Sequence, residues 1–260
     1  MRVIVTRAQA EARRWADELT IQGIGVEVLP LIEILPLAQP EALHAAWLRL
    51  DGCAAVMFVS VNAVEQFFAA RPVQVRGSGV QALAGVDAWA TGPGTAAALR
   101  CAGVAAERIV APPEQSGQFD SEALWQRVRP SLPPGARVLI VRGGGADGRA
   151  AGREWLAQEL AAAGAKVDTV VAYERRLPAF TEAQRNLAQQ AACDGSLWLF
   201  SSSQAIANLA HWLPQQAWSQ ARALATHARI AAAARAAGFG SVAETRPQAH
   251  EVAASIKSMQ

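Results

Sequence analysis

The chain has 260 residues, of which 52% are hydrophobic and 18% charged, and its formal net charge is +2. These values are typical of a soluble globular protein of one or two domains, and so small a charge gives no reason to expect a nucleic acid or an anionic membrane as partner. Of the 24 basic residues only Lys166 and Lys257 are lysines. A codon bias explains much of this arginine excess, but arginines also bind carboxylates through two parallel hydrogen bonds.

The cysteines and histidines are scattered, and they indicate neither a disulfide framework nor a metal site. No CxxC or HExxH spacing occurs, and the three cysteines are Cys53, Cys101 and Cys193. The first residues, MRVIVTR, read as a strand and not as a signal segment. No apolar run approaches the roughly 20 residues of a membrane span. We therefore expect a cytoplasmic protein without metal.

In the first half of the chain, strand-like and helix-like patterns alternate. Residues 2–7 (RVIVTR) predict a strand and 8–24 a helix, and 26–37 (VEVLPLIEILPL) is extended with two prolines. Residues 56–68 (VMFVSVNAVEQFF) predict a buried strand, a polar turn and a helix. The same order is predicted for 89–104 (WATGPGTAAALRCAGV).

The second half repeats this series. Residues 137–143 (RVLIVRG) predict a strand, 151–165 an amphipathic helix that ends at a glycine, and 166–177 (KVDTVVAYERRL) a strand. Residues 197–210 (LWLFSSSQAIANLA) and 224–239 (LATHARIAAAARAAGF) again predict a strand, a turn and a helix.

Equivalent positions in the two halves lie 135 residues apart (224 − 89, and 138 − 3). One α/β unit is therefore written twice, and its continuous apolar strands predict parallel sheets covered by helices on both faces. The repeat alone would divide the chain near residue 132. It leaves open a crossed arrangement in which the two domains exchange halves.

Every predicted strand of the repeat ends in a small polar turn that opens a helix. The carboxyl ends of parallel strands form the ligand-binding edge of such a sheet, and free N–H groups at helix N-termini attract anions. Two such edges facing each other would form a cleft lined by amides, hydroxyls and arginines. This pattern predicts a site for a polyanion.

The turn 142–149 (RGGGADGR) contains G-x-G-x-x-G, and Glu174 stands at the end of the next predicted strand. These features are typical of a dinucleotide site, so an NAD(P)-dependent oxidoreductase is an alternative. The equivalent turn of the first copy, 6–13, has no glycines. A flexible anion-binding loop flanked by Arg142 and Arg149 is the favoured interpretation.

Several turn residues have a structural interpretation beside the functional one. Thr95 falls in the first turn of a predicted helix, where we expect a capped helix start, and the serines of 59–63 and 201–205 are expected to supply caps as well. The equivalent turn of the second copy has no glycine and carries His227 and Arg229. In the first copy, a ligand could then approach the backbone of the turn closely. In the second copy, the turn would offer the ligand a side-chain cation.

Tyr173 is the chain's only tyrosine. A phenol stays neutral at pH 7 and can donate a proton to a departing oxygen, so Tyr173 is a candidate general acid. A purely structural role is also compatible with the sequence, with Tyr173 as a half-buried strand residue where two domains join.

These segments, taken in order, resemble the uroporphyrinogen-III synthase family over nearly the whole chain. The similar segments are VIVTR, VEVLPLIEILP, FVSVNAVEQF, ATGPGTAAALRCAGV, VLIVRGGGADGR, GAKVDTVVAYERR, LFSSSQAIANL and ATHARIAAAARAAGF. The resemblance implies two flavodoxin-like, doubly wound α/β domains with crossed connectivity and a two-stranded linker. Residues 1–36 and 175–260 would form one domain and 37–174 the other, and the linker strands would be EILPL and YERRL.

The implied substrate is hydroxymethylbilane, a linear tetrapyrrole with eight carboxylates, which suits the predicted polyanion cleft. The implied reaction is loss of the terminal hydroxyl and ring closure through a spiro intermediate with inversion of the last pyrrole. No cofactor takes part, and we expect a monomer. A two-domain protein that binds an anion without chemistry is the remaining alternative.

The tyrosine that the family is suspected to use as proton donor matches Tyr173. Where many members have a Gly-Pro-Thr-Thr-like turn, this chain has THAR, so Arg229 would replace a threonine ligand there. The predicted contacts with the substrate are Arg7, Ser60, Asn62, Thr91, Gly92, Thr95, Arg142, Gly143, Arg149, Ser201, Ser202, Thr226 and Arg229.

Overall fold

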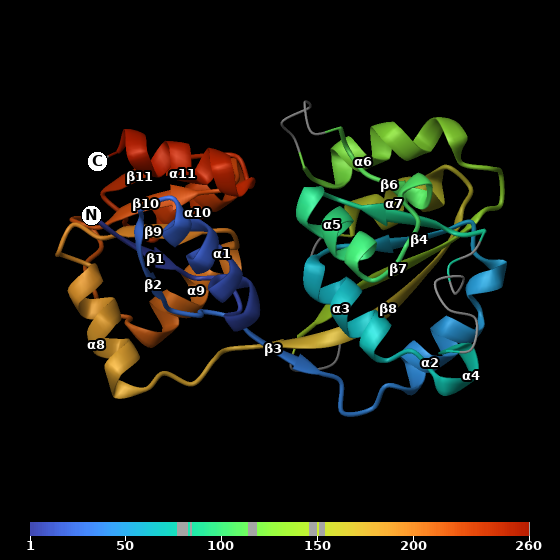
Figure 1. Ribbon diagram of the computed structural model, residues 1–260, viewed down its shortest axis with the longest axis horizontal. Helices are drawn as coiled ribbons and strands as arrows, with labels where there is room; N and C mark the ends of the chain where they lie inside the picture. Colours follow the sequence, from blue (N-terminus) through green and yellow to red (C-terminus); the bar gives the residue numbers. More distant parts are fainter. Residues whose placement is uncertain (77–82, 84, 114–118, 146–149, 151–153, 260) are drawn as a thin grey trace. The chain divides into compact units, whose positions relative to one another are not determined.

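The computed structural model describes the chain except for residues 77–82, 84, 114–118, 146–149, 151–153 and 260 (Figure 1). Two compact units can be distinguished. Unit 1 consists of Met1–Glu33 and Arg176–Gln260, and unit 2 of Ile34–Arg175. The chain thus leaves unit 1 once and returns to it once.

Unit 1 is built on a five-stranded sheet in the order β11-β10-β9-β1-β2, and each neighbouring pair is parallel. Its strands are β1 (Arg2–Val5), β2 (Gly25–Val28), β9 (Leu197–Phe200), β10 (Arg222–Ala225) and β11 (Ser241–Glu244). Its helices are α1 (Gln9–Ile21), α8 (Glu182–Ala191), α9 (Ser203–Trp212), α10 (Ala228–Ala236) and α11 (Ala249–Ser258).

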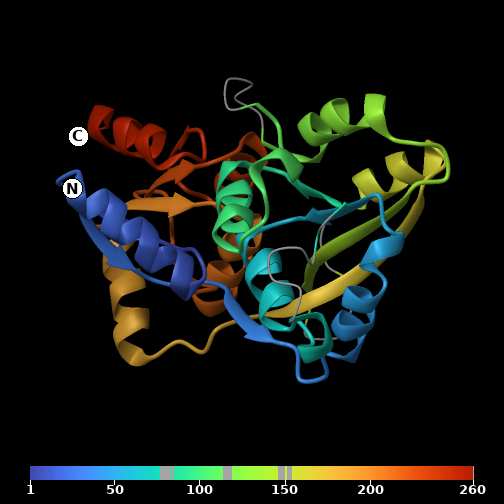
Figure 2. The same ribbon diagram turned by 45° about the vertical axis from the view of Figure 1, so that its right-hand side comes forward.

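Unit 2 contains a six-stranded sheet in the order β3-β8-β7-β4-β5-β6, which is parallel from β8 to β6. Its strands are β3 (Glu33–Pro36), β4 (Ala55–Phe58), β5 (Asp87–Ala90), β6 (Ile109–Val110), β7 (Arg137–Gly144) and β8 (Lys166–Arg176). Its described helices are α2 (Glu41–Leu48), α3 (Val61–Ala69), α4 (Val73–Arg76), α5 (Pro93–Cys101), α6 (Ser121–Val128) and α7 (Trp155–Ala162). Figure 2 shows β3 beside the long strand β8.

The strand orders show that the two copies of the repeat exchange halves. The first copy contributes β1 and β2 to one sheet and β4, β5 and β6 to the other, and the second copy contributes the complementary strands. Numbered in chain order, the unit 1 sheet has the order 2-1-3-4-5 of a flavodoxin-like sheet. Leaving β3 aside, the unit 2 sheet has the same order when numbering starts at β7, the strand equivalent to β1, and continues through β8, β4, β5 and β6. The predicted doubly wound α/β class with crossed connectivity is confirmed.

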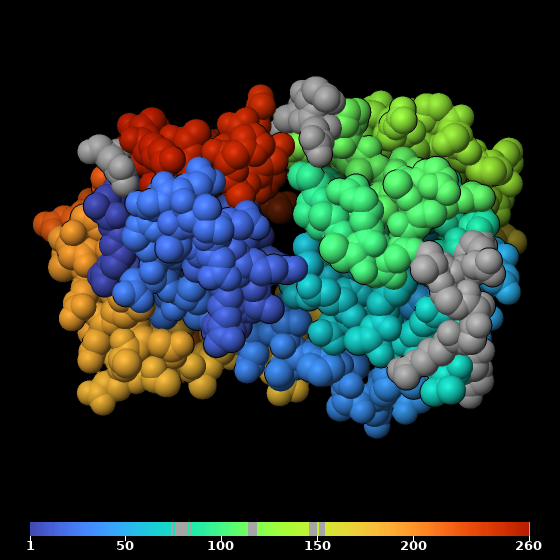
Figure 3. All heavy atoms as spheres, in the orientation of Figure 1, coloured from blue at the N-terminus to red at the C-terminus, as the bar shows by residue number. Residues whose placement is uncertain are grey.

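Strand β7 illustrates why the central strands are apolar on both faces. Leu139 and Val141 pack with α3 and α5, whereas Val138 and Ile140 pack with α6 and α7. Because successive side chains of a strand point to opposite faces, a strand between two helical layers needs apolar residues at every position. The outer surfaces of α3 and α5 form the cyan-to-green face of unit 2 in Figure 3.

Unit 1 also has a layer of helices on each face of its sheet. Helices α1 and α11 pack on Val3 and Val5 of β1, while Trp198 of β9 lies on the other face in contact with the rings of Trp218 and Phe239. The indole nitrogen of Trp198 donates a hydrogen bond to the carbonyl oxygen of Ala191 at 3.0 Å, which ties β9 to α8.

The helix ends follow local chemistry that the sequence displays. Gly103, Gly164 and Gly238 have φ between 84° and 91°, a backbone conformation that favours glycine and stops a helix. The serine caps are confirmed, since Ser60 and Ser202 accept hydrogen bonds from the first turns of α3 and α9. The capped start predicted at Thr95 is wrong. Gly92 is the N-cap of α5, and no side chain caps that helix.

Candidate active site

The carboxyl edge of the unit 2 sheet brings together four segments that are far apart in the sequence. Strands β8, β7, β4 and β5 are consecutive neighbours, so their ends form one edge. Tyr173 lies near the end of β8, Gly143 near the end of β7, Ser60 two residues after β4, and Thr91 directly after β5. Four of the predicted site positions therefore share this edge of the sheet.

Tyr173 is fully buried, with 0% of its surface exposed, and belongs to the hydrophobic cluster of unit 2. Its hydroxyl oxygen lies 3.0 Å from the Oγ of Ser60 and accepts a hydrogen bond at 3.0 Å from an Nη of Arg175. The guanidinium of Arg175 also lies 5.6 Å from the centre of the phenol ring. The phenol is thus oriented by a hydroxyl and a cation.

Gly143 makes room for the phenol ring. A Cβ at this position would lie 2.6 Å from the ring carbons Cε2 and Cζ of Tyr173 and 3.0 Å from its hydroxyl oxygen. The two residues are partners across β7 and β8, directly after a register shift between Arg142 and Gly143. Only glycine lets the backbone approach the ring this closely.

This geometry corrects the interpretation of the glycine-rich turn. Strand β7 continues through Gly144, so Arg142 and Gly143 are strand residues and not part of a flexible loop. Helix α7 begins at Trp155, well beyond the motif. A dinucleotide fingerprint needs its glycines in the tight turn that opens the helix, so the oxidoreductase alternative loses its structural basis. Arg149 lies outside the described residues.

Arg142 is buried, with 5% of its surface exposed. Burial lowers the pKa of its guanidinium from the ordinary value, Glu154 opposes this, and repulsion by Arg175 lowers the pKa further. Arg142 is thus a buried cation that is influenced both by the carboxylate of Glu154 and by the guanidinium of Arg175. A cation near the ligand edge favours a negatively charged partner.

The other predicted residues of unit 2 lie at the starts of two neighbouring helices. Ser60 is the N-cap of α3, where its Oγ accepts a hydrogen bond from the N–H of Ala63 at 3.2 Å, and partly buried Asn62 lies in the first turn. Thr91 and Gly92 precede α5 and are partly buried, whereas Thr95 is buried. These helix starts place N–H groups at the ligand edge.

A second set of predicted residues lies at the carboxyl edge of the unit 1 sheet. Strands β10, β9 and β1 are neighbours, which brings Thr226, the Ser201–Ser202 pair and Arg7 to one edge. Thr226 is buried, the two serines are partly buried, and Arg229 is exposed in the first turn of α10. His227 is the N-cap of α10, and its Nδ1 accepts a hydrogen bond from the N–H of Arg229.

Arg7 already has a carboxylate partner. Its Nη1 donates a hydrogen bond to an Oε of Glu11 at 3.0 Å, and its guanidinium lies 4.3 Å from the centre of the Trp15 ring. Burial lowers the pKa of this guanidinium, which Glu11 partly offsets. For Arg7 to bind a substrate carboxylate, that carboxylate must share the guanidinium with Glu11.

Two residues of these edges were not predicted. Arg175 is bonded to the Tyr173 hydroxyl, and its position two residues further along a strand, hence on the same face, is the signal that could have found it. Asn208 of α9 is buried and donates a hydrogen bond to the carbonyl oxygen of Leu31 at 2.6 Å. No sequence pattern distinguishes this asparagine from a surface residue of a helix.

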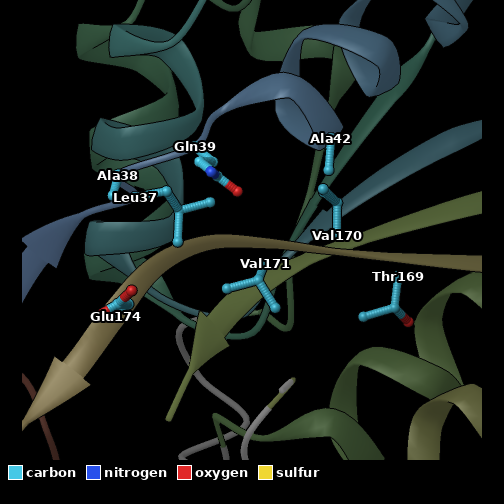
Figure 4. Close-up of a pocket in the computed structure, with 8 residues that line it drawn as sticks. All are labelled: Leu37, Ala38, Gln39, Ala42, Thr169, Val170, Val171 and Glu174. Carbon is cyan, nitrogen blue, oxygen red and sulfur yellow. The ribbon is translucent and has the colours of Figure 1, made fainter. Parts of the chain in front are cut away.

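A pocket of about 440 Å³ lies elsewhere in unit 2, along β8 and the segment before α2 (Figure 4). Its lining is mainly apolar, and Glu174 and Gln39 add polar groups. The lining residues are Leu37, Ala38, Gln39, Ala42, Thr169, Val170, Val171 and Glu174. Glu174, which the dinucleotide alternative would assign to a ribose, is thus part of this pocket.

Two features are absent from the described part of the chain. No helix there is long and apolar enough to cross a membrane. Nor do three or more histidine, cysteine or acidic side chains come together there in a way that could hold a metal ion.

Comparison with known proteins gives one family and a consistent fold. A family model described as uroporphyrinogen-III synthase HemD matches residues 13–253. The structure is similar to a mutant uroporphyrinogen III synthase from the extremely thermophilic bacterium Thermus thermophilus, with a TM-score of 0.58 and 18% identity, over 100% of this chain and 99% of the other. It is also similar to the uroporphyrinogen-III synthetase of Helicobacter pylori 26695, with a TM-score of 0.59 and 17% identity over 100% of both chains. At these identities the structural likeness shows the fold alone.

Proposed function

The chain belongs to the uroporphyrinogen-III synthase family, and from this premise we propose how its residues carry out the reaction of that family. The chain is a lyase of tetrapyrrole biosynthesis. It closes the linear tetrapyrrole hydroxymethylbilane into a ring with loss of water and inversion of the terminal pyrrole. The following groups of this chain are proposed to take part in each step of the reaction.

The observation that carries the proposal is the Tyr173 hydroxyl, held between Ser60 and Arg175 at the carboxyl edge of unit 2. The first step breaks the bond between carbon and the terminal hydroxyl of the substrate. A hydroxyl leaves as water only if it receives a proton, and the pyrrole nitrogens supply the electrons for its departure. Tyr173 is the proposed source of that proton, and Arg175 stabilises the negative charge that develops on the phenol oxygen.

The substrate carboxylates require groups that bind anions at several positions. The starts of α3, α5, α9 and α10 offer N–H groups at the two ligand edges, and a helix N-terminus attracts anions. Arg142 adds a cation in unit 2, and Arg7 and Arg229 add cations in unit 1. We propose that these groups bind the substrate carboxylates together with Asn62, Thr91, Gly92, Thr95, Gly143, Ser201, Ser202 and Thr226, and that Ser60 contacts the substrate at the same edge of unit 2.

The inversion of the last pyrrole is a problem of shape. Without an enzyme to direct it, the linear tetrapyrrole closes without inverting its terminal ring. Anion-binding groups at each sheet edge would hold substrate carboxylates in place so that the inverted closure occurs first. Positioning of this kind can account for several kcal/mol of the barrier, up to roughly 7–11 kcal/mol in favourable cases, without a dedicated base. We also propose that the protein works as a cytoplasmic monomer, a location with which its three free cysteines are compatible.

The test is the isomer formed from freshly prepared hydroxymethylbilane. We expect the purified protein to produce the type III isomer, and Tyr173→Phe to lower kcat by roughly 10²-fold or more because it removes a general acid. Circular dichroism of the variant checks that it is folded. Formation of the type I isomer alone by the unmodified protein would reject the proposal. Tight binding of the tetrapyrrole without turnover would instead support a non-catalytic binding protein.

A further inference from the structure

The burial of Tyr173 raises a question about how its proton reaches a substrate. The residue is 0% exposed and packs with Val141, Val170 and Ala172 in the core of unit 2. Its ring also lies against the backbone of Gly143. A ligand at the sheet edge therefore cannot touch the phenol directly in this conformation. Among the residues that the structure describes, the hydroxyl has Ser60 and Arg175 as partners.

Donor and acceptor counting favours one direction for each of these two hydrogen bonds. The guanidinium of Arg175 has no acceptor, so it donates to the Tyr173 oxygen. If Ser60 also donated to this oxygen, the phenol hydrogen would point into the apolar core without a partner, at a cost of about 1–3 kcal/mol. The favoured arrangement has Tyr173 donating its hydrogen to Ser60.

Ser60 then has one hydrogen left to donate. Its Oγ accepts from Tyr173 and from the N–H of Ala63, which occupies both lone pairs of a hydroxyl oxygen. Unlike Tyr173, Ser60 is partly exposed, and it lies at the carboxyl edge where α3 begins. Its own O–H is therefore the outward end of a chain that runs from Arg175 through Tyr173 to the ligand edge.

We propose that Ser60 is the group that transfers the proton to the leaving hydroxyl of the substrate, and that Tyr173 acts through it. This inference rests on the proposed function. As the carbon–oxygen bond breaks, the Ser60 proton passes to the leaving oxygen and water departs. The phenol proton moves to Ser60 at the same time, and the resulting phenolate is stabilised by Arg175. When the last pyrrole regains its aromaticity, the proton that its carbon loses returns along the same path, so the site is restored.

The test compares two substitutions of Ser60 with the loss of the phenol hydroxyl. Ser60→Ala removes the outward donor and should lower kcat for type III formation by roughly 10²-fold or more, as Tyr173→Phe should. Because both variants break the same chain, the double variant should be about as slow as either single one. Ser60→Thr keeps both the hydroxyl and the cap and should restore most of the activity.

Ser60 is also a helix cap, so the loss of a cap needs its own control. Thr181 also caps a helix, α8, where it accepts from the N–H of Gln184 at 3.2 Å, and it is not one of the edge residues described above. Thr181→Ala should lower the melting temperature about as much as Ser60→Ala and leave kcat within about twofold of the unmodified protein.

A readout besides activity comes from the single tyrosine. Incorporation of 3-fluorotyrosine labels Tyr173 alone, and its fluorine resonance should shift in Ser60→Ala and keep its position in Thr181→Ala. The proposal is overturned if Ser60→Ala retains full kcat while Tyr173→Phe is slow, or if their effects multiply in the double variant. Failure of the unmodified protein to form the type III isomer would instead reject the proposed function, so the two failures can be distinguished.

Discussion

Gly143 and Tyr173 face each other on neighbouring strands, and the phenol ring occupies the space where any other residue at 143 would place its Cβ. The clash involves ring carbons that are themselves packed in the core, so the ring cannot move aside without disturbing its neighbours. Overpacking of this kind costs about 1–3 kcal/mol. It would also move the hydroxyl away from Ser60.

We therefore predict that Gly143→Ala lowers both stability and activity. Its free energy of unfolding should fall by about 1–3 kcal/mol, and kcat by up to ~10²-fold, because a displaced catalytic group loses its alignment. Urea denaturation and the isomer assay measure the two effects. Gly52→Ala is the matched control, since the nearest atom to a Cβ there is the flexible end of Arg137 at 3.8 Å. Equal behaviour of the two variants would contradict the role of Gly143.

The sequence predicts some of these residues and misses others for identifiable reasons. Tyr173 stands out because it is the only tyrosine, and Ser60 because it falls in a polar turn after an apolar strand. Arg175 does not stand out, since an arginine near the end of a strand is usually an exposed charge. Its function depends on the phenol beside it, and that contact is visible only once β8 is placed against β7 and β4.

At the scale of elements, the sequence pattern predicts which segments form strands and helices. It does not predict where the strands end. The predicted strand 137–143 overlaps the predicted turn 142–149, yet Gly143 and Gly144 both pair with β8 because a long neighbouring strand offers hydrogen-bond partners. Asn208 shows the same limit for helices. Its side chain ties α9 to the segment after β2 through a contact between residues 177 positions apart.

Asp194 lies just before β9 and forms an ion pair with Arg2, the first residue of β1. Burial raises the pKa of its carboxyl, but hydrogen bonds from Ser196 and attraction by Arg2 outweigh burial and hold the pKa below its usual range. A carboxyl whose pKa is lower in the folded than in the unfolded state stabilises the fold above the unfolded pKa of about 3.9. This contribution is lost as the pH falls through the folded pKa.

We predict that Asp194→Asn lowers the melting temperature at pH 7, and that the difference from the unmodified protein shrinks toward pH 3. Calorimetry at a series of pH values measures this difference. The exposed Asp51→Asn serves as the control for removing one negative charge. A difference that stays constant with pH would show that the carboxylate does not stabilise the junction of β1 and β9.

At the scale of the whole molecule, the repeat and the strand order give different divisions of the chain. The repeat cuts the sequence near residue 132, between its two copies. The sheets instead pair β4 of the first copy with β7 of the second, and β1 of the first with β9 of the second. Periodicity records which segments are alike and carries no information on which strands become neighbours, so the crossing could be expected only from resemblance to a family.

The crossed arrangement makes residues 34–175 a contiguous piece of chain that contains a whole sheet and both of its helical layers. We propose that this fragment is a domain, and we predict that it folds alone with a single cooperative transition in urea. Far-ultraviolet circular dichroism and tryptophan fluorescence should give coincident curves. The fragment should not cyclise the substrate, because it lacks the ligand edge of unit 1.

Fragment 1–132 is the matched control, because it keeps one complete copy of the repeat and separates β4 from β7. Strand β4 would then expose an unpaired edge, and Val56 and Phe58 would lose their apolar neighbours Leu139 and Val141. We expect this fragment to unfold without a cooperative transition or to aggregate. The reverse outcome, a cooperative 1–132 and a disordered 34–175, would mean that the chain is divided by its repeat and that the crossed domains do not fold as independent units.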